Sequence, residues 1–127
     1  MKSIIVSINF KRASILMTFC IAASIGLLSL IPLSVPQGMP GTDKTHHFIA
    51  YAFLVLPIAI QSPRSLIWLI PMAAVFGGLI EIVQPYVNRF GEWRDFQADL
   101  FGIALGVFIG LGLRRCVPTQ YRRQLNN

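Results

Sequence analysis

All five acidic residues of this 127-residue chain, and both of its histidines, fall in three short polar segments beside long apolar runs. Carboxylates grouped with an imidazole suit a divalent cation or a proton relay, and basic residues beside them suit phosphate. The segments cover residues 43–47, 81–84 and 89–99. We single out eight residues from them as a polar cluster: Asp43, Lys44, His47, Glu81, Gln84, Arg89, Asp95 and Asp99.

Glu81 is the hardest of these residues to explain as a surface group, because 16 uncharged residues precede it in its apolar run. A carboxylate at mid-bilayer costs about 2.5–3.5 kcal/mol, so Glu81 should be neutral or paired. The same reasoning applies to Asp99, which lies at the start of the last apolar run. A purely structural ion pair is the alternative at both positions. The candidate partners of Glu81 are Lys44, His47, Arg89 and Arg94.

Helical spacing places several of these residues on one face. Asp43, His47 and Tyr51 are four residues apart and share a face of a helix. His46 points about 100° away from His47 on the same helix. At most one of the two histidines can therefore face the centre of a helix bundle.

In the third and fourth apolar runs, polar residues share a helix face with glycines. In the third run, Gly77 shares a face with Glu81 and Gln84. In the fourth, acidic residues share a face with small residues that recur every four positions, a spacing that lets a neighbouring helix approach closely. This face consists of Asp95, Asp99, Gly102, Gly106 and Gly110. We predict that the three glycines are helix-packing positions.

Members of the polar cluster also have ordinary structural explanations. Asp43 and Asp95 are placed where side chains cap helix N-termini. Lys44 can extend to lipid headgroups, and Arg89 can bind lipid phosphates without specificity. His47 can be an interfacial hydrogen-bonding residue. These explanations stay open at the level of sequence.

Composition decides the class of protein in which these residues must act. Apolar residues make up 54% of the chain, charged residues 13%, and the mean hydropathy is +0.63. This excludes a soluble enzyme with a large water-facing surface, a disordered chain and a disulfide scaffold. The net charge is +6, but the basic residues sit at the ends of apolar runs and form no aromatic-interleaved stripe, so we expect no nucleic-acid partner.

The apolar runs predict an all-α fold, an integral membrane four-helix bundle formed by a single domain over residues 1–127. We expect membrane-spanning helices over about 13–35, 46–62, 66–84 and 97–113. Pro85 disfavours helical geometry at Gln84, so the third helix should end or bend there. A cleaved signal peptide is the competing interpretation of the first run, but that run is longer than the usual apolar stretch and no A-x-A site follows it.

The distribution of basic residues predicts the orientation of the chain. The segments before the first run, between the second and third, and after the fourth hold 8 basic residues, whereas the other two loops hold 3. The positive-inside rule therefore predicts that both termini are cytoplasmic and that the polar cluster lies at the outer face. Cys20 and Cys116 lie in or near the reducing side, so neither predicts a disulfide.

Three blocks of the sequence resemble the signature of VanZ-like membrane proteins. Residues 43–51, DKTHHFIAY, resemble D-K-x-x-H-F-x-x-Y, and residues 77–84, GGLIEIVQ, are similar to G-x-x-I-E-x-x-Q. Arg89 followed by residues 95–102, DFQADLFG, resembles R…D-x-x-A-[ND]-x-x-G. The blocks fall in family order, and the resemblance covers about residues 40–112. It implies a small multi-pass protein of the bacterial cytoplasmic or inner membrane, in a family whose name-giving member is linked to resistance to the glycopeptide teicoplanin.

We expect a membrane module without enzymatic activity that binds or handles an anionic envelope lipid or lipid-linked precursor at its outer face. Lys44, Arg89 and Arg94 would meet phosphate, and membrane lipids are the expected partners. No catalytic residue, cofactor or metal ion is assigned, because no spacing matches a catalytic motif such as H-E-x-x-H. The alternatives are a proton- or ion-coupled small transporter acting as a homo-oligomer, an intramembrane enzyme or metal site using the Asp/His/Glu groups, and a structural or assembly subunit.

Overall fold

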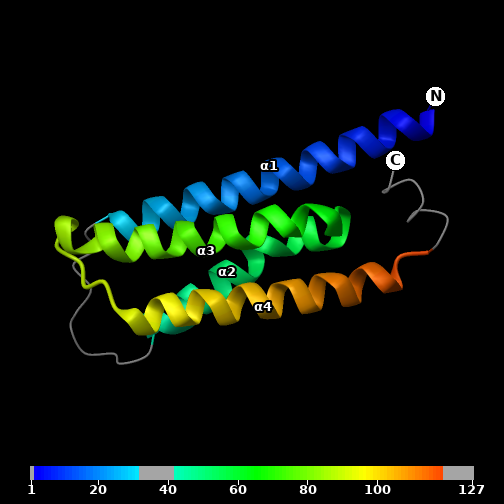
Figure 1. The fold of residues 1–127 in the computed structure, drawn as a ribbon. Coiled ribbons are helices and arrows are strands. Elements are labelled where there is room, and N and C mark those ends of the chain that lie inside the picture. The colour runs from blue at the N-terminus through cyan, green and yellow to red at the C-terminus, as the bar shows by residue number, and fades with distance from the viewer. Residues whose placement is uncertain (1, 32–41, 119–127) are drawn as a thin grey trace.

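The computed structural model describes residues 2–31 and 42–118, with side chains from Phe10 and from Lys44 onward in these two ranges. Within them the chain forms four α-helices and two short 3-10 helices, with no strand (Figure 1). The α-helices are α1 (Lys2–Leu30), α2 (Thr42–Gln61), α3 (Leu66–Val83) and α4 (Trp93–Cys116), and the 3-10 helices are η1 (Pro63–Ser65) and η2 (Gln84–Val87). The predicted all-α class is confirmed.

The helix boundaries differ from the predicted spans mainly at the ends that carry polar residues. α2 begins at Thr42 and α4 at Trp93, about one turn before the predicted starts at 46 and 97. Lys44, His47, Asp95 and Asp99 therefore lie within the helices, whereas Arg89 and Glu92 lie in the loop before α4. α3 ends at Val83, where Pro85 predicts an end, and the chain continues as η2. α1 ends at Leu30, and its predicted end at residue 35 lies outside the described residues.

Three of the described helical stretches are long and apolar enough to cross a membrane. They are Phe10–Leu30, Pro63–Val87 and Trp93–Cys116. α2 is not among them, because its first turns carry several polar side chains, and the predicted span over 46–62 stays a prediction. Large apolar side chains are exposed on the outer faces, including Trp68 of α3 and Phe108 of α4. Long apolar helices with outward-facing apolar side chains fit a membrane protein.

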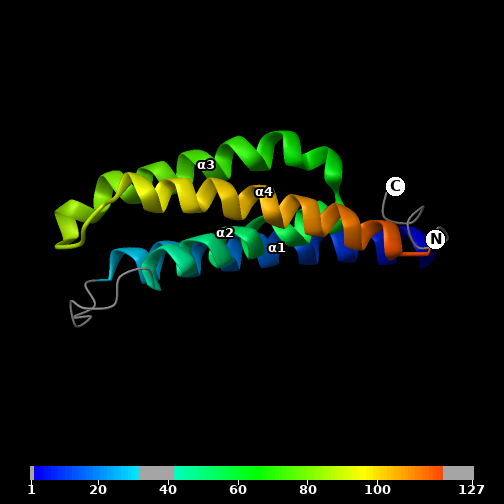
Figure 2. The same cartoon turned by 90° about the horizontal axis from the view of Figure 1, so that it is seen from below.

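α2 is the central helix of the arrangement. It packs on α1, α3 and α4, and its contact with α4 is the most extensive in the molecule. Figures 1 and 2 show that the end of α1, the start of α2, the end of α3 and the start of α4 lie together at one end of the molecule. We call this the polar end. The start of α1 and the end of α4 lie at the opposite end.

The close contact between α2 and α4 depends on the glycines of α4. A Cβ atom on Gly102 would overlap the carbonyl of Phe48, and one on Gly106 would overlap the carbonyl of Ala52. A Cβ atom on Gly110 would overlap the side chain of Ala59. The small-residue stripe is thus covered by α2 within the same chain. It therefore offers no surface to a second copy, and the expected homo-oligomer stays a prediction that this stripe does not support.

Candidate functional site

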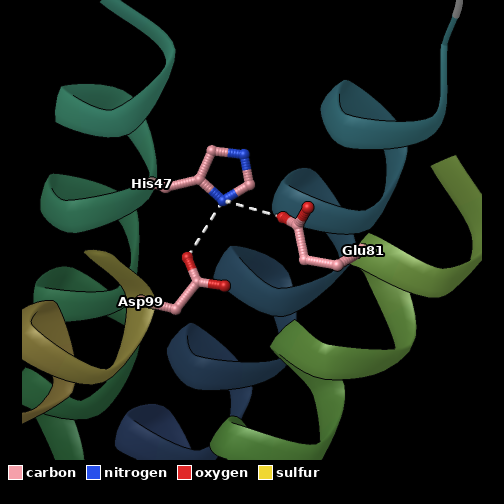
Figure 3. Close-up of side chains that lie close together, drawn as sticks. All are labelled: His47, Glu81 and Asp99. Atoms are coloured by element: carbon pink, nitrogen blue, oxygen red, sulfur yellow. Dashed lines mark hydrogen bonds and ion pairs between the residues drawn. The ribbon is translucent and has the colours of Figure 1, made fainter. Parts of the chain in front are cut away.

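Three buried ionisable side chains from three different helices meet at the polar end. His47 comes from α2, Glu81 from α3 and Asp99 from α4 (Figure 3). The Nδ1 atom of His47 lies 2.9 Å from Oδ1 of Asp99 and 3.8 Å from Oε1 of Glu81. The exposed fractions of the three side chains are 6%, 10% and 0% for His47, Glu81 and Asp99. We call these three residues the triad.

Helix periodicity explains why His47 is the histidine in the triad. His47 is buried, whereas the neighbouring His46 is exposed. Successive residues of a helix point about 100° apart, so the inward position of one histidine turns the other outward. Tyr51 follows His47 by one turn on the same face and is fully buried.

Asp99 occupies space that the absence of a side chain at Gly77 leaves open. An ideal Cβ on Gly77 would lie 2.6 Å from Oδ2 of Asp99 and 3.2 Å from the hydroxyl oxygen of Tyr51. These two buried oxygens therefore approach the same point on α3. Among the described residues neither has a hydrogen-bond partner. Buried polar atoms in native proteins are nearly always hydrogen-bonded, so this part of the site has unused capacity to bind a polar group.

Glu81 connects α3 to the start of α4. Its Oε2 atom accepts a 2.8 Å hydrogen bond from the backbone N–H of Glu92, the residue that precedes α4. Its Oε1 atom faces His47 and has no hydrogen-bond partner among the described residues. One oxygen thus holds the loop, and the other is directed into the triad.

Lys44 forms the rim of the site with two carboxylates. Its Nζ atom lies 2.8 Å from Oε2 of Glu92 and 3.5 Å from Oδ1 of Asp95. The hydrogen bond between Lys44 and Glu92 raises the pKa of the lysine and lowers the pKa of the glutamate. Glu92 and Asp95 hold Lys44. The basic side chain that the described contacts place beside Glu81 and Asp99 is therefore His47.

Two predicted members of the polar cluster contact α1 and not the triad. Gln84 donates to the carbonyl of Ser29 at 3.4 Å. Arg89 donates to the carbonyl of Leu28 at 2.8 Å and to that of Ile31 at 3.4 Å. Arg89 was one of four candidate partners of Glu81. The described ion pairs place His47 beside Glu81, and Arg89 donates to carbonyls at the end of α1.

Of the remaining predicted residues, Asp95 lies at the rim, Arg94 is exposed, and the side chain of Asp43 is not among those that the structure describes. Asp95 is buried beside Lys44, one turn of α4 before Asp99. The side chain of Asp43 lies outside the described residues, so its predicted place in the cluster is untested. Arg94, proposed from sequence as a phosphate ligand, is exposed on the first turn of α4.

The loop between α3 and α4 adds an open pocket and exposed aromatic side chains. The pocket is lined by Pro85, Asn88, Arg89, Phe90 and Gly91. Tyr86, Phe90 and Trp93 are largely exposed around it. Amphipathic aromatic side chains such as Tyr and Trp are typical of the headgroup level of a bilayer. The polar end thus combines a buried acidic site with an interfacial loop.

Sequence reasoning missed three residues with a clear role. Glu92 bonds to Lys44 through its side chain and to Glu81 through its backbone, although the sequence shows only a loop acid. The buried hydroxyl of Tyr51 lies beside Asp99, and its spacing from His47 was the available signal. Arg114 is buried and donates to the carbonyls of Ile60 and Gln61 at the end of α2. No local signal distinguishes it from an orientation charge.

The arrangement can hold a proton or a cation better than an anion. The triad presents one imidazole and two carboxylates in a buried space, a nitrogen and oxygen donor set. An anion would be repelled there and fits only the rim and the loop, where basic side chains lie. Comparison of the sequence with family models, with curated proteins and with solved structures finds no match.

Proposed function

We propose that this chain is a membrane protein of the VanZ-like type, a four-helix bundle with both termini in the cytoplasm. In this proposal the loop between α3 and α4, at the outer face, binds the anionic headgroup of an envelope lipid or lipid-linked precursor. The proposal extends the expectation drawn from the sequence: Arg89 and Arg94 remain the phosphate ligands, and Lys44 is left out because Glu92 and Asp95 hold it.

The three sequence blocks that resemble the VanZ-like signature come together in space, which supports a shared function for them. His47, Glu81 and Asp99 belong to the three blocks, of which the first two are separated by an apolar run and the last two by the segment between α3 and α4. One ligand atom of each residue lies within 4.8 Å of the others. Residues that are far apart in the chain come together in this way both at functional sites and in hydrophobic cores. The convergence at the polar end therefore supports treating the three blocks as one unit.

The distribution of charge supports the proposed orientation. Arg64 of η1 and Arg114 and Arg115 of the last turn of α4 lie at the end opposite the polar end. Basic residues collect on the cytoplasmic side of membrane proteins. This end is therefore assigned to the cytoplasm, and the polar end to the outer face.

The observation that carries the lipid proposal is the open pocket of the loop between α3 and α4. Asn88, Arg89 and the exposed Phe90 line it, and the exposed Arg94 follows shortly after in the chain. A guanidinium with adjacent amide donors suits a phosphate oxygen. The triad behind the loop is acidic and repels an anion. In this proposal the lipid phosphate therefore stays at the surface, and the acyl chains of the lipid lie beside the helices.

The test is lipid capture by the full chain in nanodiscs. Nanodiscs made from mixed zwitterionic and anionic phospholipids are compared by native mass spectrometry for wild type, Arg94→Gln, Arg89→Gln and Arg64→Gln. The proposal expects anionic lipid to be retained by wild type and Arg64→Gln, and at least tenfold less by Arg89→Gln and Arg94→Gln. Arg64→Gln is the matched control, since it removes an exposed arginine at the opposite end.

Arg89→Gln removes hydrogen bonds to the end of α1 and could lower lipid binding by disturbing the fold. Arg94→Gln tests the proposal without this complication. Arg94 is exposed and holds no described helix end, so its substitution leaves the packing unchanged. Equal retention of anionic lipid by wild type, Arg94→Gln and Arg64→Gln would refute the proposal.

A further inference from the structure

We propose that His47, Glu81 and Asp99 form a binding site for one divalent transition-metal ion, for which zinc is the representative. Each residue offers one ligand atom, and these atoms lie within 4.8 Å of one another. The ligands come from α2, α3 and α4, so the ion would join three helices at the polar end. This inference does not rest on lipid binding by the loop.

The distances suit a shared ion. Zinc holds its nitrogen and oxygen ligands at about 2.0–2.2 Å, which places two tetrahedral ligand atoms about 3.3 Å apart. His47 Nδ1 and Glu81 Oε1 lie 3.8 Å apart, and His47 Nδ1 and Asp99 Oδ1 lie 2.9 Å apart. Side-chain adjustments of about half an ångström bring both separations to the required value. The shorter of the two distances is that of the hydrogen bond between His47 and Asp99.

The charges of the buried site favour a cation. Two carboxylates face one imidazole, and the nearby ammonium of Lys44 is held by Glu92 and Asp95. Unbalanced buried charge is costly, and a doubly charged ion balances Glu81 and Asp99 with a neutral histidine. A metal ion is thus the ligand whose charge fits the side chains present.

An independent observation is the set of buried oxygens that point into the site without a partner. Glu81 Oε1 faces His47, and Oδ2 of the fully buried Asp99 has no hydrogen-bond partner among the described residues. The hydroxyl of the fully buried Tyr51 is likewise unpartnered and lies beside Asp99. A bound ion would use the carboxylate oxygens as ligands. The tyrosine would then orient Asp99, as hydrogen-bond donors commonly orient the carboxylates that bind metals.

The donor set selects the class of metal. Magnesium and calcium prefer sites made of oxygen alone, whereas an imidazole favours zinc and its first-row neighbours. Three protein ligands leave one position of a tetrahedral ion open. We therefore expect zinc to bind more tightly than magnesium or calcium, with water in the remaining position.

The experiment measures zinc binding by the full chain in a zwitterionic detergent without added lipid. Metal is first removed with a chelator, and zinc is then titrated calorimetrically in two buffers that differ in their enthalpy of ionisation. The proposal expects one zinc per chain and an enthalpy that depends on the buffer, because metal ligands bind in their deprotonated forms and the ion takes the place of the hydrogen-bonded proton between His47 and Asp99. An equal concentration of magnesium should give no saturable signal.

His46→Ala and His47→Ala are the matched pair of variants. The two histidines are adjacent, but only His47 belongs to the triad. We expect His47→Ala, Glu81→Gln and Asp99→Asn to lower the zinc affinity at least 100-fold, and His46→Ala to change it less than threefold. Circular dichroism of each variant confirms that the helices are retained.

The wild-type titration keeps the proposal falsifiable if a triad variant fails to fold. Absence of stoichiometric zinc binding by the wild type would overturn it without reference to any variant, as would equal losses in His46→Ala and His47→Ala. Failure of anionic lipid capture would leave this result unaffected, because no anionic lipid is present in the titration.

Discussion

The Nδ1 atom of His47 lies 2.9 Å from Oδ1 of Asp99, and this contact joins α2 to α4 in the buried part of the polar end. The two residues are 52 positions apart in the chain. Their distance depends on how closely the two helices approach, and the glycines of α4 set that approach. Packing and site chemistry are therefore linked through the same helix pair.

Gly77 and its neighbour Gly78 allow a direct test of the space occupied by Asp99. A Cβ at Gly77 would meet Oδ2 of Asp99 at 2.6 Å, whereas one at Gly78 would meet only the Phe96 ring at 3.6 Å. We expect Gly77→Ala to destabilise the fold by about 1–3 kcal/mol, and Gly78→Ala to be neutral or stabilising because alanine is the better helix former. Thermal unfolding in detergent measures both. A cost of Gly77→Ala that persists undiminished in an Asp99→Ala background would contradict this explanation.

Gly106 and Gly112 test the contact between α2 and α4 in the same way. A Cβ on Gly106 would overlap the backbone carbonyl of Ala52, which cannot move aside, whereas Gly112 has nothing within 4 Å. We expect Gly106→Ala to cost about 1–3 kcal/mol through forced separation of the helices. Gly112→Ala is the control and should not lower the melting temperature. Similar melting temperatures for the two variants would count against close packing at Gly106.

Arg114 should stabilise the end of α2. Its Nη1 atom donates to the carbonyl of Ile60 at 2.6 Å and to that of Gln61 at 3.0 Å. Hydrogen bonds from charged groups contribute about 1.5–3 kcal/mol, so we expect a loss of that size in Arg114→Gln. Arg64→Gln, at an exposed position of the same end, should change stability by less than about 0.5 kcal/mol. Denaturant unfolding followed by tryptophan fluorescence distinguishes the two outcomes.

The ion pair of Lys44 and Glu92 predicts a small dependence of stability on pH. The pKa of Glu92 lies below its ordinary value of 4.5, so its contribution is present above that value and is lost as pH falls through the lowered pKa. The pKa of Lys44 lies above its ordinary value of 10.5, so its contribution is present below that value and is lost as pH rises through the raised pKa. The stability difference between wild type and Glu92→Gln should therefore be greatest near neutral pH.

Melting temperatures of wild type and Glu92→Gln between acidic and neutral pH test this expectation. The two curves should converge in acid, and the difference at neutral pH should shrink in high salt because both side chains are partly exposed. A difference that stays constant from neutral pH into acid would contradict this explanation, because the backbone contact of Glu92 with Glu81 is present in both proteins and only the side-chain charge differs.

Much of the fold follows from local patterns in the sequence. Helices end near prolines and polar segments, as at Val83 before Pro85. The inward position of His47 and the outward position of His46 follow from the helical period alone. The spacing of the glycines predicts that another helix packs on this face of α4, but it does not show that the partner is α2.

These local patterns do not predict contacts between segments that are distant in the sequence. Arg89 was one of the candidate partners of Glu81, yet it donates to the carbonyl of Leu28 in α1 and to that of Ile31, which follows α1. Backbone carbonyls at a helix end carry no sequence signal for their partner, because every residue has one. Glu92 and Arg114 escaped notice for the same reason, since each acts largely through backbone groups of another segment.

The sequence by itself determined that the chain is apolar and helical, and which residues share a face of each helix. These properties depend on composition and on the period of a single helix, both of which are local. The tertiary structure decided that His47, Glu81 and Asp99 meet, that Lys44 is held by Glu92 at the rim, and that Arg89 serves α1. Those pairings depend on the rotation and separation of packed helices, which the glycine contacts between α2 and α4 establish only once the chain is folded.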